Sequence, residues 1–214
     1  QLFEEEMCEY LGLPAGHAVA VTSGSSALYV ALKVLGLANE HVAMPSYVCN
    51  SLKQACLLNH SKPVFVDNRA KLPVVDASLV NNELGSDKDT AALIYPYMYG
   101  FATELPKHPC LIEDVAQALG ATYGGHKLGT LGDLGVLSFY ATKMITSGGQ
   151  GGMLVSKNKG LIDAARDFLE FDQNLDDKAH FNLHITEMQA AIGRVQLRKL
   201  PEFIEKRAQL WDIY

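Results

Sequence analysis

Short apolar runs alternate with longer amphipathic stretches along most of the chain. Helical periodicity occupies residues 25–36, 49–59, 158–171 and 185–200. Strands that alternate with helices in this way predict an α/β fold, in which a mostly parallel seven-stranded sheet carries helices on both faces. The seven runs that predict strands are rich in β-branched and aromatic residues and contain or adjoin turn residues: AVAVTS (18–23), HVAMPS (41–46), PVFVD (63–67), AALIYPYMYG (91–100), CLIEDVA (110–116), GVLSFY (135–140) and GGMLVS (151–156).

The two ends of the sequence have helical patterns. The segment QLFEEEMCEYLG (1–12) places apolar residues on one helical face and stops at Gly12, a residue type that commonly ends helices. The segment PEFIEKRAQLWDIY (201–214) predicts another helix, which begins with Pro201 at its first position and meets no stop signal. We therefore expect the sequence to be a piece of a longer chain.

The stretch ITEMQAAIGRVQLRKL (185–200) predicts a helix with an apolar stripe. Met188, Ile192 and Val195 recur at helical spacing on one face, with Ala191 beside them. Such a stripe is typical of packing against a core or against a second copy of the chain, and the pattern alone leaves both open.

Composition narrows the class of partner. The chain has 214 residues, of which 48% are hydrophobic and 20% charged, and a net charge of -6 with no basic run, which argues against nucleic acid or an acidic membrane as the main partner. Four cysteines show no CxxC pairing and no metal-ligand spacing, so we expect reduced thiols and no metal. No apolar run reaches the ~20 residues that span a bilayer, and no signal peptide opens the sequence, which favours a cytoplasmic protein.

A strand runs into a helix at VTSGSSALYVAL (21–32). The first turn of that helix contains Gly24, Ser25 and Ser26, and a helix start combines free backbone N–H groups with a positive dipole end. Serine hydroxyls add further donors, so the segment predicts a phosphate-binding helix start. A serine that simply caps a core helix explains this segment equally well.

Two other stretches carry candidate chemistry at strand ends. Glu113 and Asp114 close an apolar strand, with Gln117 one turn later, and a buried carboxylate there would call for a cation. Otherwise the two acids would mark a strand terminus that enters solvent. Lys143 follows the strand 135–140 and precedes a glycine-rich loop; it is either a solvated lysine or a lysine held where α/β proteins bind ligands.

One ligand accounts for all three stretches. Pyridoxal 5'-phosphate has an aldehyde that reacts with a lysine, a ring nitrogen that pairs with a carboxylate and a phosphate that suits a helix N-terminus. Lys143, Asp114 and the pair Ser25 and Ser26 supply these groups, and the hydroxyl of Ser138 lies close enough in sequence to Lys143 to reach the same phosphate.

The ordered series of motifs resembles the DegT/DnrJ/EryC1/StrS family of pyridoxal-phosphate-dependent nucleotide-sugar aminotransferases. The resemblance covers almost the whole chain and implies a fold type I large domain over residues 1–200. It also implies a homodimer with shared active sites, and transfer of an amino group from glutamate to a keto-sugar nucleotide in amino-sugar and polysaccharide biosynthesis. The motifs that carry it are SGSSAL, PVFVD, YG, IEDVAQALGATYGG, LGDLGVLSFYATK, GGQGG and FNLHITEMQAAIGRVQLRKL.

The resemblance also implies residue roles. Lys143 looks like the lysine that bonds to the cofactor, Asp114 like the partner of the ring nitrogen and Gln117 like the residue near the ring oxygen. Gly24, Ser25, Ser26 and Ser138 fall where the family holds the phosphate, and Asn182 matches an asparagine that reaches the phosphate of the neighbouring subunit. A lysine at position 143 favours transamination over dehydration.

Some positions depart from the family pattern. Cys49 stands where relatives often place an aromatic ring on the cofactor face, and Tyr47, two positions earlier, is a candidate substitute. The stretch 101–110 is short for a crossover between parallel strands, so we expect a single turn or an irregular loop there. Residues 201–214 would begin the helix that leads to a small C-terminal domain in relatives. His184, where relatives commonly have a basic residue, receives no role.

Two other functions fit the same scaffold. A sugar dehydratase or isomerase, or a transaminase of amino acids, would keep the fold and the cofactor and change the reaction. A non-catalytic dimerising relative would keep only the fold. Binding of pyridoxal phosphate separates the last from the others, and the choice of keto substrate separates the rest.

Overall fold

The computed structural model describes residues 1–69, 74–75, 77–84, 90–172 and 176–213. Its helices are α1 (Leu2–Leu11), α2 (Gly24–Val34), α3 (Ser51–Leu58), α4 (Ala77–Leu84), α5 (Lys159–Leu169) and α6 (Glu187–Trp211). Its strands are β1 (Ala18–Val21), β2 (His41–Pro45), β3 (Lys62–Val66), β4 (Thr90–Pro96), β5 (Leu111–Asp114), β6 (Thr122–Tyr123), β7 (His126–Lys127), β8 (Leu134–Ser138) and β9 (Gly152–Val155).

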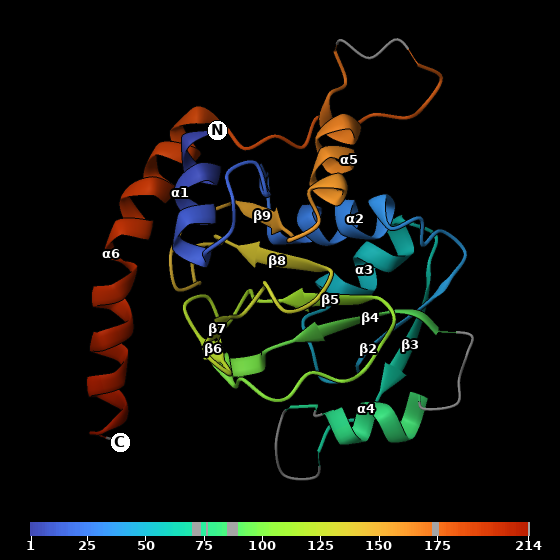
Figure 1. Cartoon of the computed structure of the whole chain (residues 1–214), viewed down its shortest axis with the longest axis horizontal. Coiled ribbons are helices and arrows are strands. Elements are labelled where there is room, and N and C mark those ends of the chain that lie inside the picture. The colour runs from blue at the N-terminus through green and yellow to red at the C-terminus, as the bar shows by residue number, and fades with distance from the viewer. Residues whose placement is uncertain (70–73, 76, 85–89, 173–175, 214) are drawn as a thin grey trace.

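Seven of these strands form one sheet in the order β1-β9-β8-β5-β4-β2-β3 (Figure 1). Strands β8, β5, β4, β2 and β3 run parallel to one another, and β9 runs antiparallel to both β8 and β1. All seven strands that the pattern predicts are present, so the prediction of a mostly parallel seven-stranded sheet is confirmed. Because parallel strands end at one edge, the last residues of β2, β4, β5 and β8 lie near one another.

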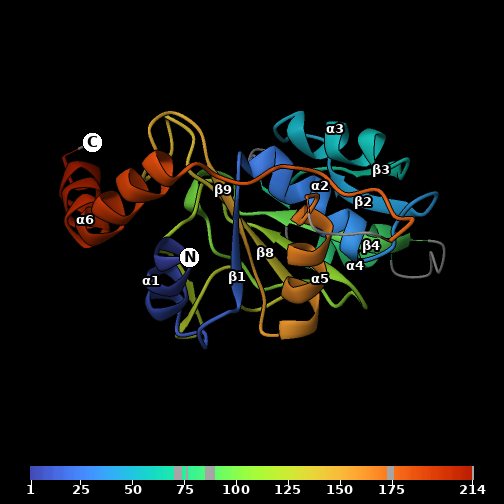
Figure 2. The same ribbon diagram turned by 90° about the horizontal axis from the view of Figure 1, so that it is seen from above.

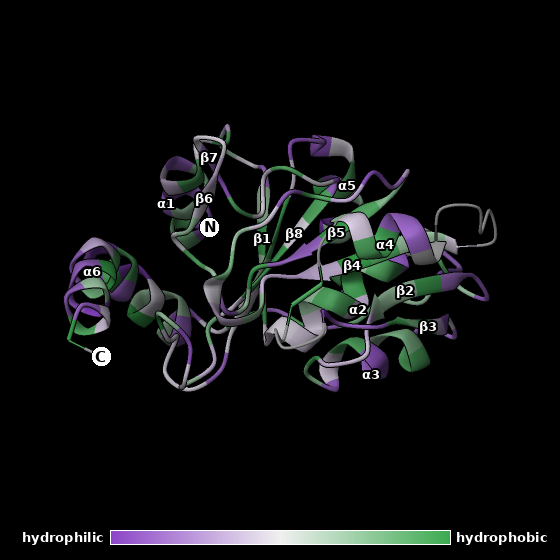
Figure 3. Ribbon diagram, turned by 90° about the horizontal axis from the view of Figure 1, so that it is seen from below, coloured by the Kyte–Doolittle hydropathy of each residue, from purple (hydrophilic) through white to green (hydrophobic). Residues whose placement is uncertain are grey.

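Apolar side chains cover both faces of the sheet. Helices α2, α3 and α5 bury one cluster against one face, and α1, α4 and the middle of α6 contribute to a second cluster on the other. The strands are largely green in the hydropathy view, whereas the helices carry purple segments as well (Figure 3). The helices that the sequence predicts on both faces are therefore present, and α4 and the hairpin β6–β7 are additions that the apolar pattern did not indicate.

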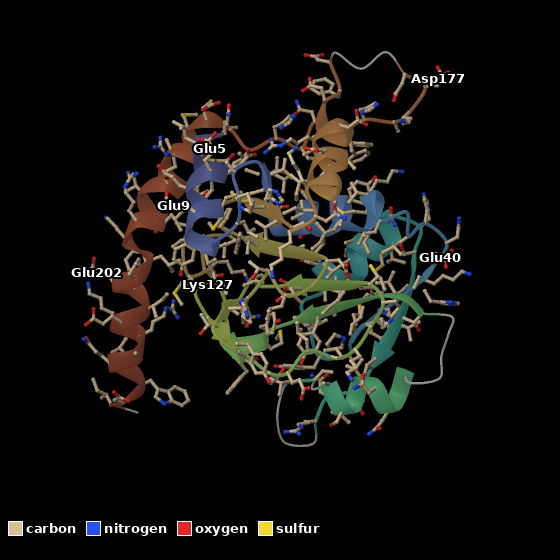
Figure 4. The ribbon with its side chains drawn as sticks, in the orientation of Figure 1. Glu5, Glu9, Glu40, Lys127, Asp177 and Glu202 are labelled. Atoms are coloured by element: carbon tan, nitrogen blue, oxygen red, sulfur yellow. The ribbon has the colours of Figure 1, made fainter. Side chains whose placement is uncertain are left out.

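Helix α6 lies beside α1 at one side of the molecule (Figures 1 and 2). Arg194 binds Glu6 between the two helices, with Nη2 2.6 Å from Oε1. Lys127 of the hairpin places its Nζ 4.5 Å from the centre of the Tyr10 ring, below α1 in Figure 4. None of the described helices is long and apolar enough to cross a membrane.

The expectation that a new helix begins at Pro201 is wrong. Pro201 lies inside α6, which continues unbroken to Trp211. Leu197 and Leu200 are buried before the proline, and Phe203 and Ile204 pack against the same cluster after it. The apolar face of the helix therefore runs through Pro201, and burial of that face outweighs the one backbone hydrogen bond that proline cannot make.

Three other expectations can be compared with the structure. The end of α1 at Gly12 is confirmed, since Gly12 has φ 74° and its N–H bonds to the last turn. Residues 101–110 contain no helix or strand after the 3₁₀ turn Met98–Gly100, as expected for a short crossover. The α6 stripe is exposed, with 78% of Met188 and 43% of both Ile192 and Val195 accessible, so core packing within this chain is wrong. Packing against a second copy stays a prediction.

Candidate active site

A cavity of about 410 Å³ opens where β4, β5 and β8 end and where α2 and α3 begin. Several residues that the sequence singled out line it together: Gly24, Ser25, Cys49, Asp114, Gln117, Ser138 and Lys143. They come from segments far apart in the sequence, and the parallel sheet brings them to one edge. Ser26, Tyr47 and Asn182 are outside this lining.

The start of α2 separates the roles of its serines. Ser23 is the N-cap, and its Oγ accepts a hydrogen bond of 3.0 Å from the backbone N–H of Ser26. The hydroxyl of Ser26 lies 2.9 Å from Ser23 Oγ and 2.8 Å from Thr22 Oγ1, so it serves the cap. The capping interpretation therefore holds for Ser23 and Ser26, although Ser23 also lines the cavity, and of the two serines predicted to bind phosphate in this turn only Ser25 lines it.

Gly24 lets β8 approach the first turn of α2. A Cβ at Gly24 would lie 2.8 Å from the Cβ of Ser138, closer than side-chain carbons come. Glycine at this position thus allows Ser138 to sit directly against the helix start. The backbone N–H groups of Gly24 and Ser25, with Ser25 Oγ and Ser138 Oγ, then form one polar surface at a positive helix end, which suits an anion such as a phosphate.

Asp114 places a nearly buried carboxylate in the cavity wall. Its side chain is 8% exposed, and Oδ1 accepts a hydrogen bond of 3.0 Å from the backbone N–H of Ala116. Burial raises the pKa of the Asp114 carboxyl, and the Ala116 N–H and the charge of Lys143 act against that rise. The carboxylate therefore gains from any cation that enters the cavity.

Lys143 reaches the same cavity from the loop after β8. Its backbone N–H bonds to the carbonyl of Tyr140 at 2.9 Å, which closes a turn, and the residue is half-buried. Lys143 lines the cavity, and no described side chain accepts a hydrogen bond from its Nζ. Its place in the cavity wall, beyond the end of β8, is the one that the ligand-binding interpretation predicts.

Glu113 corrects the expectation that a buried carboxylate here needs a cation. Glu113 is fully buried, and its oxygens accept four hydrogen bonds, from the hydroxyl of Tyr97 and from the backbone N–H groups of Gly129, Leu131 and Gly132. Neutral donors can stabilise a buried carboxylate when they fill its acceptor positions. Both acids of the pair are therefore inside, and neither marks a strand terminus in solvent.

Gln117 and Tyr47 make contacts outside the predicted ones. Gln117 Oε1 accepts a hydrogen bond of 2.9 Å from the backbone N–H of Tyr99. The Tyr47 side chain is 54% exposed, and its hydroxyl lies 3.1 Å from that of Tyr99. Of the two candidates for the cofactor face, Cys49 therefore lines the cavity and Tyr47 does not.

Asn182 is exposed on a segment beside the edge strand β1. Leu183 O accepts a hydrogen bond of 2.8 Å from the N–H of Thr22, and His184 pairs with Val21. This holds the segment along the sheet edge, with Asn182 in solvent. Its contact with a neighbouring subunit stays a prediction.

Sequence reasoning missed several residues of the cavity wall, among them Ser51, Tyr97, Tyr140 and Gln150. Ser51 begins α3, and its Oγ accepts a hydrogen bond of 3.0 Å from Ser25 Oγ. Its position just after Cys49, at the start of a predicted helix, was the signal available. Tyr97 directly follows β4, and the rule that ligands bind at strand ends points to it as well.

Comparison with known proteins gives a consistent result. The model of the DegT/DnrJ/EryC1/StrS aminotransferase family matches residues 1–214. The GDP-perosamine synthase of Caulobacter vibrioides is 32% identical over 99% of this chain and 60% of its own length. The UDP-N-acetyl-3-dehydro-alpha-D-glucosamine 3-aminotransferase of Acidithiobacillus ferrooxidans is 30% identical over 91% of this chain and 56% of its own length.

A solved structure shows the same fold. The crystal structure of the aminotransferase TlmJ from Streptoalloteichus hindustanus superposes with a TM-score of 0.89 at 28% identity, and the match covers 100% of this chain and 61% of that protein. The chain thus spans about three fifths of the length of these relatives. By the match along its whole length, the chain belongs to the DegT/DnrJ/EryC1/StrS aminotransferase family.

Proposed function

We propose that the chain is the cofactor-binding part of a pyridoxal-phosphate-dependent aminotransferase that moves an amino group from glutamate to a keto-sugar nucleotide. The observation that carries the proposal is the convergence of Lys143 and Asp114 on one cavity, beside the polar surface formed by Ser25 and Ser138. Relatives named as GDP-perosamine synthase and as a UDP-sugar aminotransferase support a nucleotide sugar as the acceptor.

The residues of the cavity fit this cofactor by their chemistry. The Asp114 carboxylate would pair with the ring nitrogen, and the Lys143 amine would bond to the aldehyde carbon. The α2 helix start, Ser25 and Ser138 would hold the phosphate. Gln117 would lie near the ring oxygen, and Cys49 would pack on the ring face, where a thiol covers less area than an aromatic side chain.

Each residue has a defined part in the reaction. When bound, pyridoxal phosphate supplies an aldehyde that exchanges amino groups and a protonated ring that withdraws electrons from the reacting carbon. Asp114, once ionised, would keep a proton on the ring nitrogen, because a buried carboxylate is stabilised by a cationic partner. Once the amino group of the donor has displaced it from the aldehyde carbon, the free amine of Lys143 would take the proton from the donor carbon that bears that amino group.

The proposed enzyme works as a homodimer in the cytoplasm. The exposed α6 stripe of Met188, Ile192 and Val195 supports packing against a second copy, since apolar side chains at helical spacing gain from burial. Asn182 would reach the phosphate in the neighbouring subunit. Nucleotide sugars and reduced thiols, of which the chain has four, both fit the cytoplasm.

The test is covalent capture of the cofactor. Purified protein is mixed with pyridoxal phosphate, its visible absorbance is recorded, and borohydride reduction followed by peptide mass mapping locates the adduct. We expect an absorbance band and an adduct on Lys143, and neither in Lys143→Ala. Lys53→Ala, which removes an exposed lysine of α3, is the matched control and should behave as wild type.

Either of two results would refute the proposal. Folded wild-type protein that shows no band and no adduct would support a non-catalytic relative. An adduct of equal yield on Lys53 and Lys143 would mean that pyridoxal phosphate reacts with surface amines and has no dedicated site.

A further inference from the structure

Glu113 is a buried ionisable group that the proposed reaction does not use. Its side chain is fully buried on β5, directly before Asp114. Successive residues of a strand point to opposite faces of the sheet, so the two adjacent carboxylates lie in different surroundings. A carboxylate is costly to bury, which raises the question of what Glu113 does at this position.

Both oxygens of Glu113 are saturated with donors. Oε1 accepts hydrogen bonds from Leu131 N–H at 2.6 Å and Gly132 N–H at 2.7 Å. Oε2 accepts from Gly129 N–H at 2.9 Å and from the Tyr97 hydroxyl at 2.7 Å. Only the ionised carboxylate, which accepts and does not donate, satisfies four donors at once.

These four bonds connect elements that build the cavity. Tyr97 follows β4, Glu113 belongs to β5, and the segment 129–132 leads into β8. The cavity wall takes Tyr97 from the first, Asp114 from the second and Ser138 from the third. The Glu113 side chain therefore connects the three segments that supply the Tyr97 ring, the Asp114 carboxylate and the Ser138 hydroxyl to the cavity wall.

The segment 129–132 is closely fitted to β5 around this carboxylate. A Cβ at Gly132 would lie 2.7 Å from the carbonyl oxygen of Leu111 and 3.3 Å from Cγ of Glu113. The backbone of the segment thus approaches the strand more closely than a side chain would permit. A rigid connection of this kind leaves β8 little freedom to shift relative to β5.

Tyr97 is held at both ends. Its backbone N–H bonds to the carbonyl oxygen of Asp114 at 3.1 Å, and its hydroxyl bonds to Glu113. Burial and the neighbouring Glu113 carboxylate raise the pKa of the Tyr97 hydroxyl, so the hydroxyl remains a donor. The ring is also packed edge-on against Tyr95, with centroids 5.5 Å apart.

We propose that Glu113 is a positioning residue of the active site: through Tyr97 and the segment 129–132 it sets where Asp114 and Ser138 stand in the cavity. This inference rests on the proposed function, because the position of these two groups matters for holding pyridoxal phosphate. Glu113 itself does not line the cavity, and it acts on the cofactor only through the residues that it positions.

Tyr97→Phe is the main test, and the chain offers a matched control. Tyr95, two residues earlier, is equally buried, and its hydroxyl bonds to Val75 O at 2.8 Å and lies 2.5 Å from Thr103 Oγ1, away from Glu113. Both Tyr97→Phe and Tyr95→Phe keep the ring and lose a buried hydroxyl. Unfolding in urea should therefore show a loss of stability in both variants, and a larger one in Tyr97→Phe, because the Tyr97 hydroxyl donates to a carboxylate.

The readout that separates positioning from stability is the dissociation constant for pyridoxal phosphate, measured by absorbance titration of folded protein. We expect Tyr97→Phe to weaken binding about tenfold, because small errors in the placement of binding groups are costly, and Tyr95→Phe to bind as wild type. Glu113→Gln, whose amide cannot accept from all four donors, should weaken binding further where it folds.

The outcomes separate this inference from the proposed function. If wild-type protein takes up no cofactor, the proposed function fails and this inference fails with it. If wild type binds and folded Tyr97→Phe binds equally well, the proposed function stands and Glu113 is only a structural residue.

Discussion

The side-chain oxygen of Gln117 accepts a hydrogen bond of 2.9 Å from the backbone N–H of Tyr99. Tyr99 has a left-handed backbone, with φ 57° and ψ 17°, a conformation that costs a residue with a side chain about 1 to 2 kcal/mol. Gln117 lines the candidate active site, so a site residue holds a strained turn next to the cavity. Strain of this kind persists only where the surroundings impose it.

The strain at Tyr99 predicts an unusual order of stabilities. Tyr99→Gly and Tyr99→Ala both remove the exposed ring, and glycine adopts the left-handed backbone freely. We expect the glycine variant to be more stable than the alanine variant by about 1 kcal/mol in urea unfolding.

Phe101 provides the control for this comparison. It is half exposed and has an ordinary backbone, with φ -67°, so Phe101→Ala should be more stable than Phe101→Gly. The same order of alanine and glycine at both positions would show that Tyr99 is not strained.

The buried carboxylate of Asp114 predicts a stability that depends on pH. Burial raises the pKa of Asp114, so the folded protein binds this proton more tightly than the unfolded chain does. The contribution of Asp114 to stability is therefore most favourable below the ordinary aspartate pKa and is lost as the pH rises through the raised pKa. In protein without cofactor, Asp114→Asn should increase the free energy of unfolding at neutral pH, and this gain should shrink as the pH falls.

Urea unfolding at a series of pH values measures this effect. Asp163→Asn is the control, because Asp163 lies on the surface of α5, 53% exposed, and pairs with the equally exposed Lys159. It should give little change at any pH, as exposed ion pairs contribute little. A loss of stability in Asp114→Asn at neutral pH would contradict the electrostatic account.

Cys49 should be the cysteine that reacts first with iodoacetamide. Its thiol is exposed in the cavity wall, whereas Cys8 is buried, and burial raises the pKa of Cys56 and of Cys110 to about 11. Reaction needs an accessible thiolate, which these three positions disfavour. We expect pyridoxal phosphate to slow the labelling of Cys49, measured by peptide mass mapping.

Cys8 serves as the internal control, since it should stay unlabelled with and without the cofactor. Equal rates at Cys49 in both conditions would show that Cys49 does not face the bound cofactor, and that the exposed Tyr47 or another residue covers the ring.

The convergence of Asp114 and Lys143 could be expected from the sequence, and the state of Glu113 could not. Asp114 ends one apolar strand and Lys143 follows another, and parallel strands bring their ends to one edge whatever the length of chain between them. Glu113 is satisfied by backbone donors at 129–132, in a turn whose partner no local pattern specifies. Hydrogen bonds between distant backbone segments depend on the assembled fold.

The direction of each side chain within a helix turn was a second feature that could not be predicted from the sequence. SGSS placed Ser25 and Ser26 together at a helix start, and only the structure shows that Ser26 turns to the cap while Ser25 faces the cavity. Neighbouring positions on a helix point in directions about a quarter turn apart, so a motif identifies the turn and not the donor.

Pro201 shows how tertiary packing overrides a local stop signal, and it gives the last prediction. The proline has no N–H to donate to the carbonyl of Leu197, yet α6 continues because its apolar face is buried on both sides of the proline. Pro201→Ala restores the donor at an exposed position and should raise the free energy of unfolding by up to about 3 kcal/mol. Gln209→Ala, at another exposed position of α6, should change it by less than about 0.5 kcal/mol. The free energy of unfolding of each variant is measured in urea and compared with wild type. If Pro201→Ala is no more stable than wild type, the proline costs the helix nothing, and the carbonyl of Leu197 is already satisfied by other means.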